Sequence, residues 1–325
     1  MLGAALSAEV RSTVRALHST DDAVVQASLD VLLILSRTQE TRDLLVAEGA
    51  AAQLVQLVLL AEAAAEVNVD LLEASCEALL ALCQGRKDVS ASVARECGSR
   101  DLASVLKGHA GAEHRALRHK MATSLIRLLA LSSQHEKNVG VCARLDGTLA
   151  LLLDVLGAPA RAELHAATLE LLEVYLRSSS LNVDYALGGG RLAVVYEVVE
   201  GGLGVRALML HGLRVLRSCC AHGDKNVAAI AAEGGVRVAM AALQRHADDL
   251  EVAAAVTALV GRMMADAGGL ALLHDARAFE KLDCLLPLHP DQRALQKQVC
   301  MLMWGLSARP PAGRRPAAAR APSAG

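Results

Sequence analysis

Long apolar segments with the three-and-four spacing of a helix face alternate with short polar links along this chain. A leucine recurs in these segments at Leu128, Leu172 and Leu216, 44 residues apart, and the register continues at Leu259 and Leu302, 43 residues apart. An asparagine follows ten residues after each of the first three leucines, at positions 138, 182 and 226. A period of this length indicates stacked helical repeats, because one repeat alone cannot bury its apolar face.

Each repeat has the same predicted internal order. A long helix is often opened by a residue whose side chain satisfies the free N–H groups of the first turn. These residues are Asp22, Asn68, Asp248 and Asp291. A short amphipathic helix follows and ends at glycine, which adopts the left-handed backbone of a sharp turn. These glycines are Gly49, Gly98, Gly147, Gly188 to Gly190, Gly234 and Gly235. A second short helix then leads to the next long one.

Residues 224–246, "DKNVAAIAAEGGVRVAMAALQRH", show the first two helices of this unit most clearly. The segment resembles the armadillo repeat family, whose unit has a first helix of N-x-x-x-I-x-x-x-G-G type, a second helix and a leucine-rich third helix. The resemblance implies an all-α protein, a right-handed α-solenoid of about six to seven three-helix repeats with a period of 43–49 residues. We expect one solenoid over residues 1–307, with an incomplete first repeat at 1–20.

The two ends of the chain differ from the repeats. Neither end has an obviously polar capping repeat, although a solenoid needs its terminal apolar faces covered. End-to-end self-association is therefore one expectation, and a segment of a longer protein is another. Residues 308–325 hold four of the seven prolines and four arginines with almost no core-forming residue, so we expect a disordered tail.

Residues 193–212, "AVVYEVVEGGLGVRALMLHG", suggest a different class of protein. Gly202, Gly204 and Ala207 have the G-x-G-x-x-A spacing of a dinucleotide-binding loop, and Asp224 lies near the place of a ribose-binding acid. That motif needs a parallel strand before its glycines and further βαβ units around it. Since every neighbouring segment has a helical pattern, we interpret 193–201 as the second helix of a repeat and place a dinucleotide-binding enzyme last.

Composition narrows the function classes. The chain is 53% hydrophobic but only 2% aromatic, so Ala, Leu and Val must build a core of closely packed helices. A formal net charge of −2 gives no basic face for nucleic acid. The most apolar stretch, "LALLLDVLGA", is too short to span a bilayer, so no membrane contact is predicted. Eight cysteines without a C-x-x-C pair favour a reducing location, cytoplasmic or nuclear.

No motif for catalysis, a cofactor or a metal stands out. The sequence contains no G-x-x-x-x-G-K-[ST], H-E-x-x-H or G-x-S-x-G. Cys219, Cys220 and His222 invite a metal site, but adjacent cysteines on a helix point about 100° apart and no second ligand pair is visible. We therefore predict a non-enzymatic protein without cofactor or metal, in which these cysteines pack in the core.

In armadillo proteins the long third helices line the inner face, and the resemblance implies that a partner binds there. Members that bind extended peptides use a ladder of Asn on these helices with Trp beside it. This chain departs from that pattern at the equivalent positions, which are Leu33, Leu82, Ala130, Val174, Ser218, Gly261 and Trp304. An adaptor that grips basic peptides, as in nuclear import, is therefore not expected.

Seven other side chains fall at or next to predicted inner-face positions: Glu170, Arg214, Arg217, Ser218, Thr257, Arg262 and Trp304. Exposed Arg and Trp are enriched in the residues that dominate binding energy. We predict that this set contacts another protein through a segment with acidic character. In the alternative interpretation, the arginines lie over apolar helix faces and Trp304 is buried at the end of the solenoid.

The predicted function is that of a protein–protein interaction scaffold or adaptor. The alternative is a regulatory armadillo-like module of a larger multidomain protein, for example a kinase. The sequence names neither the partner nor the pathway. Recognition depends on exposed side chains, and helical periodicity does not describe the surface that they form.

Overall fold

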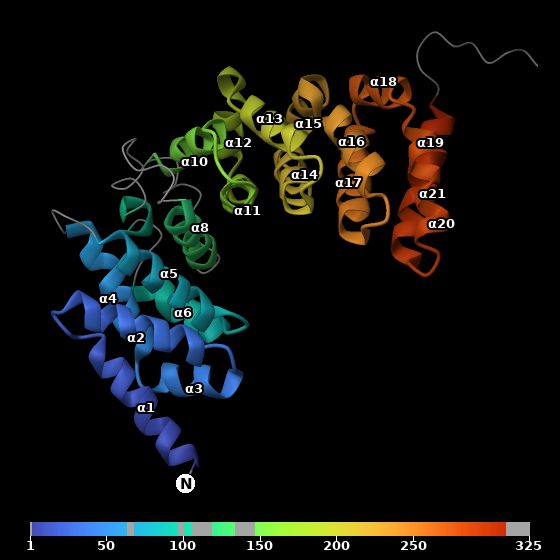
Figure 1. The fold of residues 1–325 in the computed structure, drawn as a ribbon. Helices are drawn as coiled ribbons and strands as arrows, with labels where there is room; N and C mark the ends of the chain where they lie inside the picture. Colours follow the sequence, from blue (N-terminus) through green and yellow to red (C-terminus); the bar gives the residue numbers. More distant parts are fainter. Residues whose placement is uncertain (1, 64–67, 97–100, 106–118, 134–146, 310–325) are drawn as a thin grey trace, which may run out of the picture. The chain divides into compact units, whose positions relative to one another are not determined.

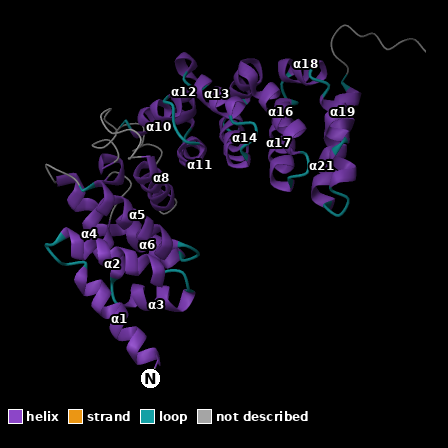
Figure 2. Cartoon of the chain, viewed as in Figure 1, coloured by secondary structure: helices purple, strands orange, loops and turns teal. Residues whose placement is uncertain are grey.

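The computed structural model describes residues 2–63, 68–96, 101–105, 119–133 and 147–309 (Figure 1). Every regular element in these ranges is a helix, and no strand is drawn among them in Figure 2. The all-α class is therefore confirmed. The chain forms two compact units, Met1–Asn182 (unit 1) and Val183–Gly325 (unit 2). A single solenoid over residues 1–307 stays a prediction, and all but the first two residues of the expected tail lie outside the described ranges.

Unit 1 contains repeats built from short and long helices. Their bounds are α1 (Leu2–Ala16), α2 (Asp22–Leu35), α3 (Gln39–Ala47), α4 (Ala50–Ala63), α5 (Val69–Cys83), α6 (Lys87–Glu96), α8 (His119–Ser133), α10 (Thr148–Gly157), α11 (Ala162–Ser178) and α12 (Ser180–Leu187), which runs across the boundary between the units. The long third helices pack in chain order, α2 on α5, α5 on α8 and α8 on α11. Their buried faces form one continuous core, to which Leu29, Leu79, Leu125 and Tyr175 belong.

Asn182 shows what one periodic asparagine does. It is fully buried, and its side-chain amide donates to the carbonyl of Tyr175 at 2.9 Å. That carbonyl lies near the C-terminal end of α11, where the last backbone oxygens of a helix lack partners within the helix. Asn182 therefore ties the first helix of its repeat to the third helix before it, and its role is structural.

Unit 2 repeats the same order of helices. Their bounds are η2 (Gly188–Gly190), α13 (Ala193–Gly201), α14 (Arg206–Cys220), α15 (Asp224–Ile230), the turn η3 (Ala231–Gly235), which bends at Gly234, α16 (Val236–His246), α17 (Leu250–Met263), α18 (Ala267–Asp275), α19 (Ala278–Asp283), α20 (Leu285–Leu288) and α21 (Arg293–Ala308). In Figure 1, α14, α17 and α21 lie side by side, and α14 packs on α17 and α17 on α21. The second helices α13, α16 and α19 pack against them. This is the layering that three-helix repeats require.

The helix starts match the predictions to within one residue. Asn68 caps α5 as expected, and its side-chain oxygen accepts from the N–H of Leu71 at 3.3 Å. The cap of α2 is instead Asp21, directly before the predicted Asp22. The cap of α17 is Asp249, directly after the predicted Asp248. A cap must have extended backbone one residue before the helix, and the sequence pattern does not distinguish two adjacent acids. Three predicted capping residues are thereby corrected, namely Asp22, Asp248 and Asp291, and the residue directly before α21 is Gln292.

Glycine occupies the turn between first and second helices as predicted. Gly49, Gly147 and Gly234 have φ of +82°, +80° and +129°, a region where a Cβ atom would be strained. Gly98 lies outside the described residues. The junction between α18 and α19 differs, because Arg277 takes the left-handed conformation there with φ of +52°. Among the described residues it is the one non-glycine side chain with positive φ.

Residues 193–201 form helix α13, so the dinucleotide-binding interpretation is wrong at its first requirement, a strand. The nearby glycines serve close packing. A Cβ on Gly202 would overlap Leu208, and a Cβ on Gly212 would overlap Val199 of α13. Glycine therefore allows close packing of α13 and α14 at Gly202 and Gly212, whereas Gly204 has open space around it.

Two described segments are long and apolar enough to cross a membrane by length and composition alone. Asp224–His246 is one of them, but it is interrupted at Gly234, and 61% of its apolar window is buried inside the protein. The other, Gln39–Ala47 with Ala50–Leu60, passes only if a bend of 72° is counted within one span. Packing between helices accounts for the apolar character of the first.

Candidate interaction surface

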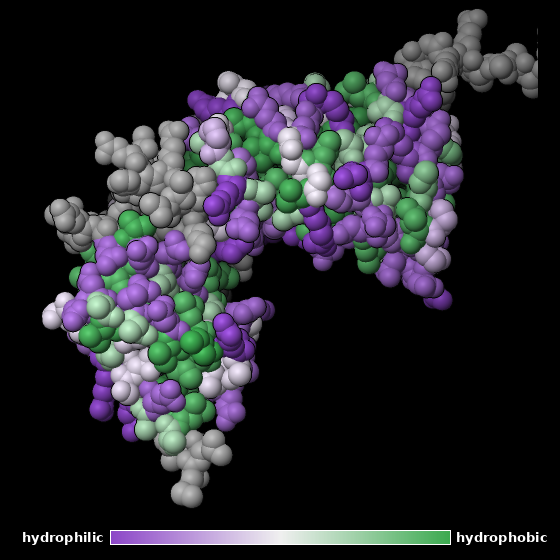
Figure 3. Space-filling model, in the orientation of Figure 1, coloured by the Kyte–Doolittle hydropathy of each residue, from purple (hydrophilic) through white to green (hydrophobic). Residues whose placement is uncertain are grey.

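The predicted binding residues of unit 2 lie on three helices that pack in a row. We call the exposed side of α14, α17 and α21 the third-helix surface, because each of these is the long third helix of its repeat. Figure 3 shows hydrophobic and hydrophilic side chains interspersed over the visible face of unit 2. The third-helix surface carries charged side chains on α14 and adds large apolar side chains on α21.

Helix α21 exposes two large apolar side chains. Trp304 is 76% exposed and Met301 is 62% exposed. Residues three apart share a helix face, so the two side chains are neighbours. They point away from the buried face of α21, which carries Val299, Leu302 and Leu306. The alternative prediction that Trp304 is buried is therefore wrong, and a tryptophan with a methionine beside it is available to a partner.

Helix α17 contributes a cation and a close contact with α21. Arg262 is exposed, as predicted. Thr257 is fully buried, and its hydroxyl donates to the carbonyl of Ala254 at 3.0 Å, so its predicted place on the binding surface is corrected. A Cβ on Gly261 would lie 3.5 Å from Leu302 of α21, in ordinary contact. Position 261 therefore faces α21 and has room for a methyl group.

Helix α14 carries two arginines in different electrostatic situations. Arg214 lies 3.9 Å from a carboxylate oxygen of Glu251 on α17, and Arg206 lies 3.2 Å from the same oxygen. Arg217 is partly exposed in the last turn of α14, and the part of the chain that the structure describes shows no ion pair for it. Ser218 is only 4% exposed, so its predicted contact with a partner is corrected as well. Arg217 is therefore freer than Arg214 to meet an acidic partner.

Glu170 lies on α11 in unit 1, where it is partly exposed. The other six predicted residues all lie in unit 2. The third-helix surface thus brings together Arg214, Arg217, Arg262 and Trp304 on one row of helices, and Glu170 belongs to a separate unit.

Sequence reasoning missed two members of this surface. The sequence pattern groups Met301 with the apolar residues of α21, although it is exposed beside Trp304. Lys297 is exposed one turn earlier, four residues before Met301. The signal for both was the spacing 297, 301, 304, which places them on one face with the tryptophan. Their exposure depends on where the neighbouring helices stop, and periodicity does not record that.

The cysteine pair of α14 packs in the core as predicted. Cys219 is fully buried and Cys220 is 2% exposed. Burial raises the pKa of the Cys219 thiol well above its ordinary value, and it raises the pKa of the Cys220 thiol to about 12. Thiols with raised pKa are poor metal ligands and poor nucleophiles, because the thiolate is the reactive form. Within the described ranges, no group of three or more His, Cys, Asp or Glu side chains is placed to hold a metal.

No model of a known protein family matches the chain, and no curated protein sequence matches it. Solved structures are similar to it. An engineered protein aligns with a TM-score of 0.70 at 18% identity, over 92% of this chain and 68% of that chain. A structure from work on a phosphorylation switch that controls the interaction between cadherin and β-catenin aligns with a TM-score of 0.65 at 18% identity, over 92% and 52%. A computationally designed armadillo repeat protein for modular peptide recognition aligns at 0.60 and 15% identity, over 78% and 99%.

These similarities show that the fold is armadillo-like, an α-solenoid of three-helix repeats. The chain spans about half of the matched chain in the cadherin and β-catenin study. At 15% to 18% identity the likeness concerns the fold alone.

Proposed function

We propose that this protein is a non-enzymatic scaffold that binds a partner protein through an extended segment on the third-helix surface. The observation that carries the proposal is the exposure of Trp304 and Met301 on α21. Large apolar side chains that stay exposed beside each other on a helix face are typical of interaction sites, and Trp is enriched among residues that dominate binding energy.

Charge favours an acidic partner segment. Arg217, Arg262 and Lys297 have no ion pair among the described residues, whereas the acidic Glu251 on this surface already faces two arginines. An approaching carboxylate therefore meets cations that are not neutralised. Complementary charge of this kind raises the association rate and selects against basic partners.

The structural neighbours support the same class of ligand. One is described as designed for modular peptide recognition, and another comes from work on the interaction between cadherin and β-catenin. A solenoid offers a peptide segment an extended surface, which supports binding rather than catalysis here.

Trp304 provides a direct test, because it is the chain's single tryptophan and its fluorescence reports on this surface alone. Partners are captured from reducing lysate with wild type and with an Arg217→Glu, Arg262→Glu, Trp304→Ala variant. The partner segment is then titrated against Trp304 fluorescence in wild type, where we expect a blue shift on binding. Isothermal titration calorimetry compares wild type with Trp304→Ala alone, for which we expect a loss of affinity of about thirtyfold, the ratio for about 2 kcal/mol.

The matched control is an Arg245→Glu, Phe279→Ala variant, which alters an exposed cation and an exposed aromatic ring outside the third-helix surface. It should capture the same partner as wild type. Equal capture by all three proteins, each with an unchanged melting temperature, would remove the third-helix surface from the function.

A further inference from the structure

Helix α17, the middle helix of the third-helix surface, exposes small residues along one line. Ala254 and Gly261 are exposed, and Ala258 is partly exposed. They are four and three residues apart, so they lie on one face of the helix. We call this line the α17 strip. Because its side chains occupy little volume, the backbone of a partner segment can approach α17 closely along it.

Larger side chains flank the α17 strip on both sides. Helix α17 packs on α14 and on α21, and it lies between them in Figure 1. Three pairs of residues follow each other at about one repeat length, namely Arg214 and Arg217 on α14, Ala258 and Gly261 on α17, and Met301 and Trp304 on α21. Neighbouring repeats of a solenoid stack on each other, so the three pairs lie at about the same level. One flank of the strip is therefore basic, and the other is apolar.

The charge of this surface is positive on balance. Helices α14, α17 and α21 contain six Lys or Arg residues and one acidic residue, Glu251. Glu251 lies 3.2 Å from Arg206 and 3.9 Å from Arg214, so it leaves the other cations without a partner on these helices. Burial raises the pKa of the Cys220 thiol on α14 to about 12, and the charge of Arg262 opposes that rise, so Arg262 lies near α14. The flank formed by α14 therefore favours an acidic ligand.

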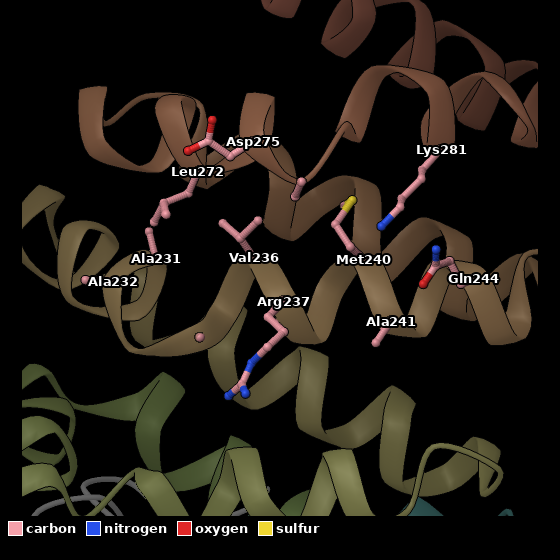
Figure 4. A pocket seen from close by; sticks show the side chains of 12 residues that line it. Ala231, Ala232, Val236, Arg237, Met240, Ala241, Gln244, Leu272, Asp275 and Lys281 are labelled. Atoms are coloured by element: carbon pink, nitrogen blue, oxygen red, sulfur yellow. The ribbon is translucent and has the colours of Figure 1, made fainter. Parts of the chain in front are cut away.

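A pocket of about 480 Å³ between α16 and α19, with further walls from η3 and α18, lacks this preference (Figure 4). Asp275 and Lys281 both line it, and their charges offset each other. The third charged lining residue, Arg237, is paired with Glu200 at 2.9 Å. The sign of a ligand's charge is therefore selected at the third-helix surface and not at this pocket.

The two flanks also favour an order of residues in the ligand. In an extended chain successive side chains point to opposite sides, and every second side chain recurs after about 6.6–6.8 Å. Steps of three and four residues along α17 cover about 4.5–6 Å. A segment that runs along the strip thus presents alternate side chains to α21 and to α14. A segment that crosses the three helices would instead need its acidic residues in one block and its apolar residues in another.

We propose that the partner segment runs along the α17 strip and alternates large apolar residues with acidic residues. This inference rests on the proposed function and specifies the ligand of the same surface. The apolar side chains pack on Met301 and Trp304, and the acidic side chains meet Arg214 and Arg217. The small residues of the strip carry the choice of direction, because they leave room for the backbone between the two flanks.

The experiment titrates synthetic peptides against the fluorescence of Trp304, the single tryptophan of the full-length protein. Each peptide has the form Ser-Gly-Ser-core-Ser-Gly-Ser with blocked ends. The alternating core is Leu-Glu-Leu-Glu, and the block core is Leu-Leu-Glu-Glu. A third core, Leu-Lys-Leu-Lys, reverses the charge. The first two peptides have the same composition, so they separate a segment along the strip from one that crosses the helices.

The alternating peptide should shift the Trp304 emission to shorter wavelength in a saturable way, with Kd of order 0.1–1 mM. The block peptide should bind at least about fivefold more weakly, because only some of its side chains can reach a matching flank at once. The lysine peptide should bind at least about tenfold more weakly, since repulsion by α14 replaces attraction.

Gly261→Leu should weaken the alternating peptide at least about tenfold, because a leucine at this exposed position occupies the strip. Leucine favours a helix more than glycine does, so the melting temperature should stay level or rise. Ala271→Leu, at an exposed position of α18 outside the third-helix surface, is the matched control and should leave the affinity unchanged. If Gly261→Leu fails to fold, Ala254→Leu makes the same test at the other end of the strip.

Two results would overturn the proposal. If the block peptide binds as tightly as the alternating one, or more tightly, the segment does not run along the strip, although the third-helix surface still binds it. If neither glutamate peptide shifts the Trp304 emission up to 5 mM, roughly five times the weakest expected Kd, no such segment binds there. Capture from lysate by wild type but not by the Arg217→Glu, Arg262→Glu, Trp304→Ala variant would then still support the proposed function, and equal capture would remove it as well.

Discussion

Asp249 determines how helix α17 begins. Its carboxylate accepts from the N–H groups of Glu251 at 3.0 Å and Val252 at 3.1 Å, and it also pairs with Arg206 on α14. The hydrogen bond with Arg206 lowers the pKa of this carboxyl below its ordinary value, and the two backbone N–H groups lower it further. One side chain thus satisfies a helix start and joins two repeats.

Replacing Asp249 by alanine should lower the free energy of unfolding by about 1–2 kcal/mol at pH 7. A lowered pKa in the folded state gives stability that is present above the unfolded pKa of about 4 and is lost as pH falls through the folded value. The wild type should therefore lose more stability than Asp249→Ala below about pH 4. Urea unfolding at pH 7 and pH 3 measures both effects.

Asp248 provides the matched control, because it is the adjacent acid and is exposed. Asp248→Ala should change the unfolding free energy by no more than about 0.5 kcal/mol at either pH. If the two alanine variants behaved alike, the cap of α17 would have been assigned to the wrong residue.

At the scale of the helices, loops in successive repeats of unit 2 are joined in the same way. His246 forms a hydrogen bond through Nε2 to the carbonyl of Leu203 at 2.7 Å. His289, 43 residues later, forms the same bond to the carbonyl of Ala247 at 2.7 Å. The sequence repeat is thus accompanied by a repeated hydrogen bond between neighbouring three-helix repeats, which the leucine register alone does not reveal.

The contact between α13 and α14 separates the two interpretations of residues 193–212. Gly212→Ala would bring a methyl group against Val199, so we expect a loss of about 1–3 kcal/mol in the free energy of unfolding. Gly204 has open space around it and no positive φ, so Gly204→Ala should change stability by less than about 0.5 kcal/mol. Urea denaturation of the two variants makes the comparison.

In a dinucleotide-binding loop, a substitution at Gly204 would impair function more than one at Gly212, because the loop needs Gly204 for the approach of a pyrophosphate. A stability loss at Gly204 as large as at Gly212 would mean that the turn before α14 is packed more closely than the structure shows.

For the molecule as a whole, stability should be local, because each repeat of a solenoid contacts only its neighbours. Leu259 is fully buried in α17, and Leu259→Ala should cost about 2–5 kcal/mol. Native-state hydrogen exchange should accelerate in α14, α17 and α21 and stay unchanged in α2 and α5. Leu250→Ala, at a 40% exposed position on the same helix, is the control with no expected change. Equal acceleration in both units would show one cooperative structure.

The sequence by itself determined the helical class, the repeat and the armadillo likeness. These follow from the spacing of Leu172, Leu216 and Leu259 and from glycine at the tight turns, which are local properties of the chain. It also supported the interpretation of residues 193–201 as a helix, since the neighbouring segments were helical.

Only the tertiary structure decided which side chains reach solvent. Ser218 and Trp304 occupy equivalent positions in the repeat, yet they are 4% and 76% exposed. Periodicity specifies the face of a helix on which a residue lies, but its exposure depends on which helices pack over that face. The same reason explains why the pocket between α16 and α19 was not predicted from the sequence. Its small lining residues come from three separate segments, with Ala231 and Gly234 in η3, Ala241 in α16 and Ala276 between α18 and α19, and these segments meet only in the folded chain.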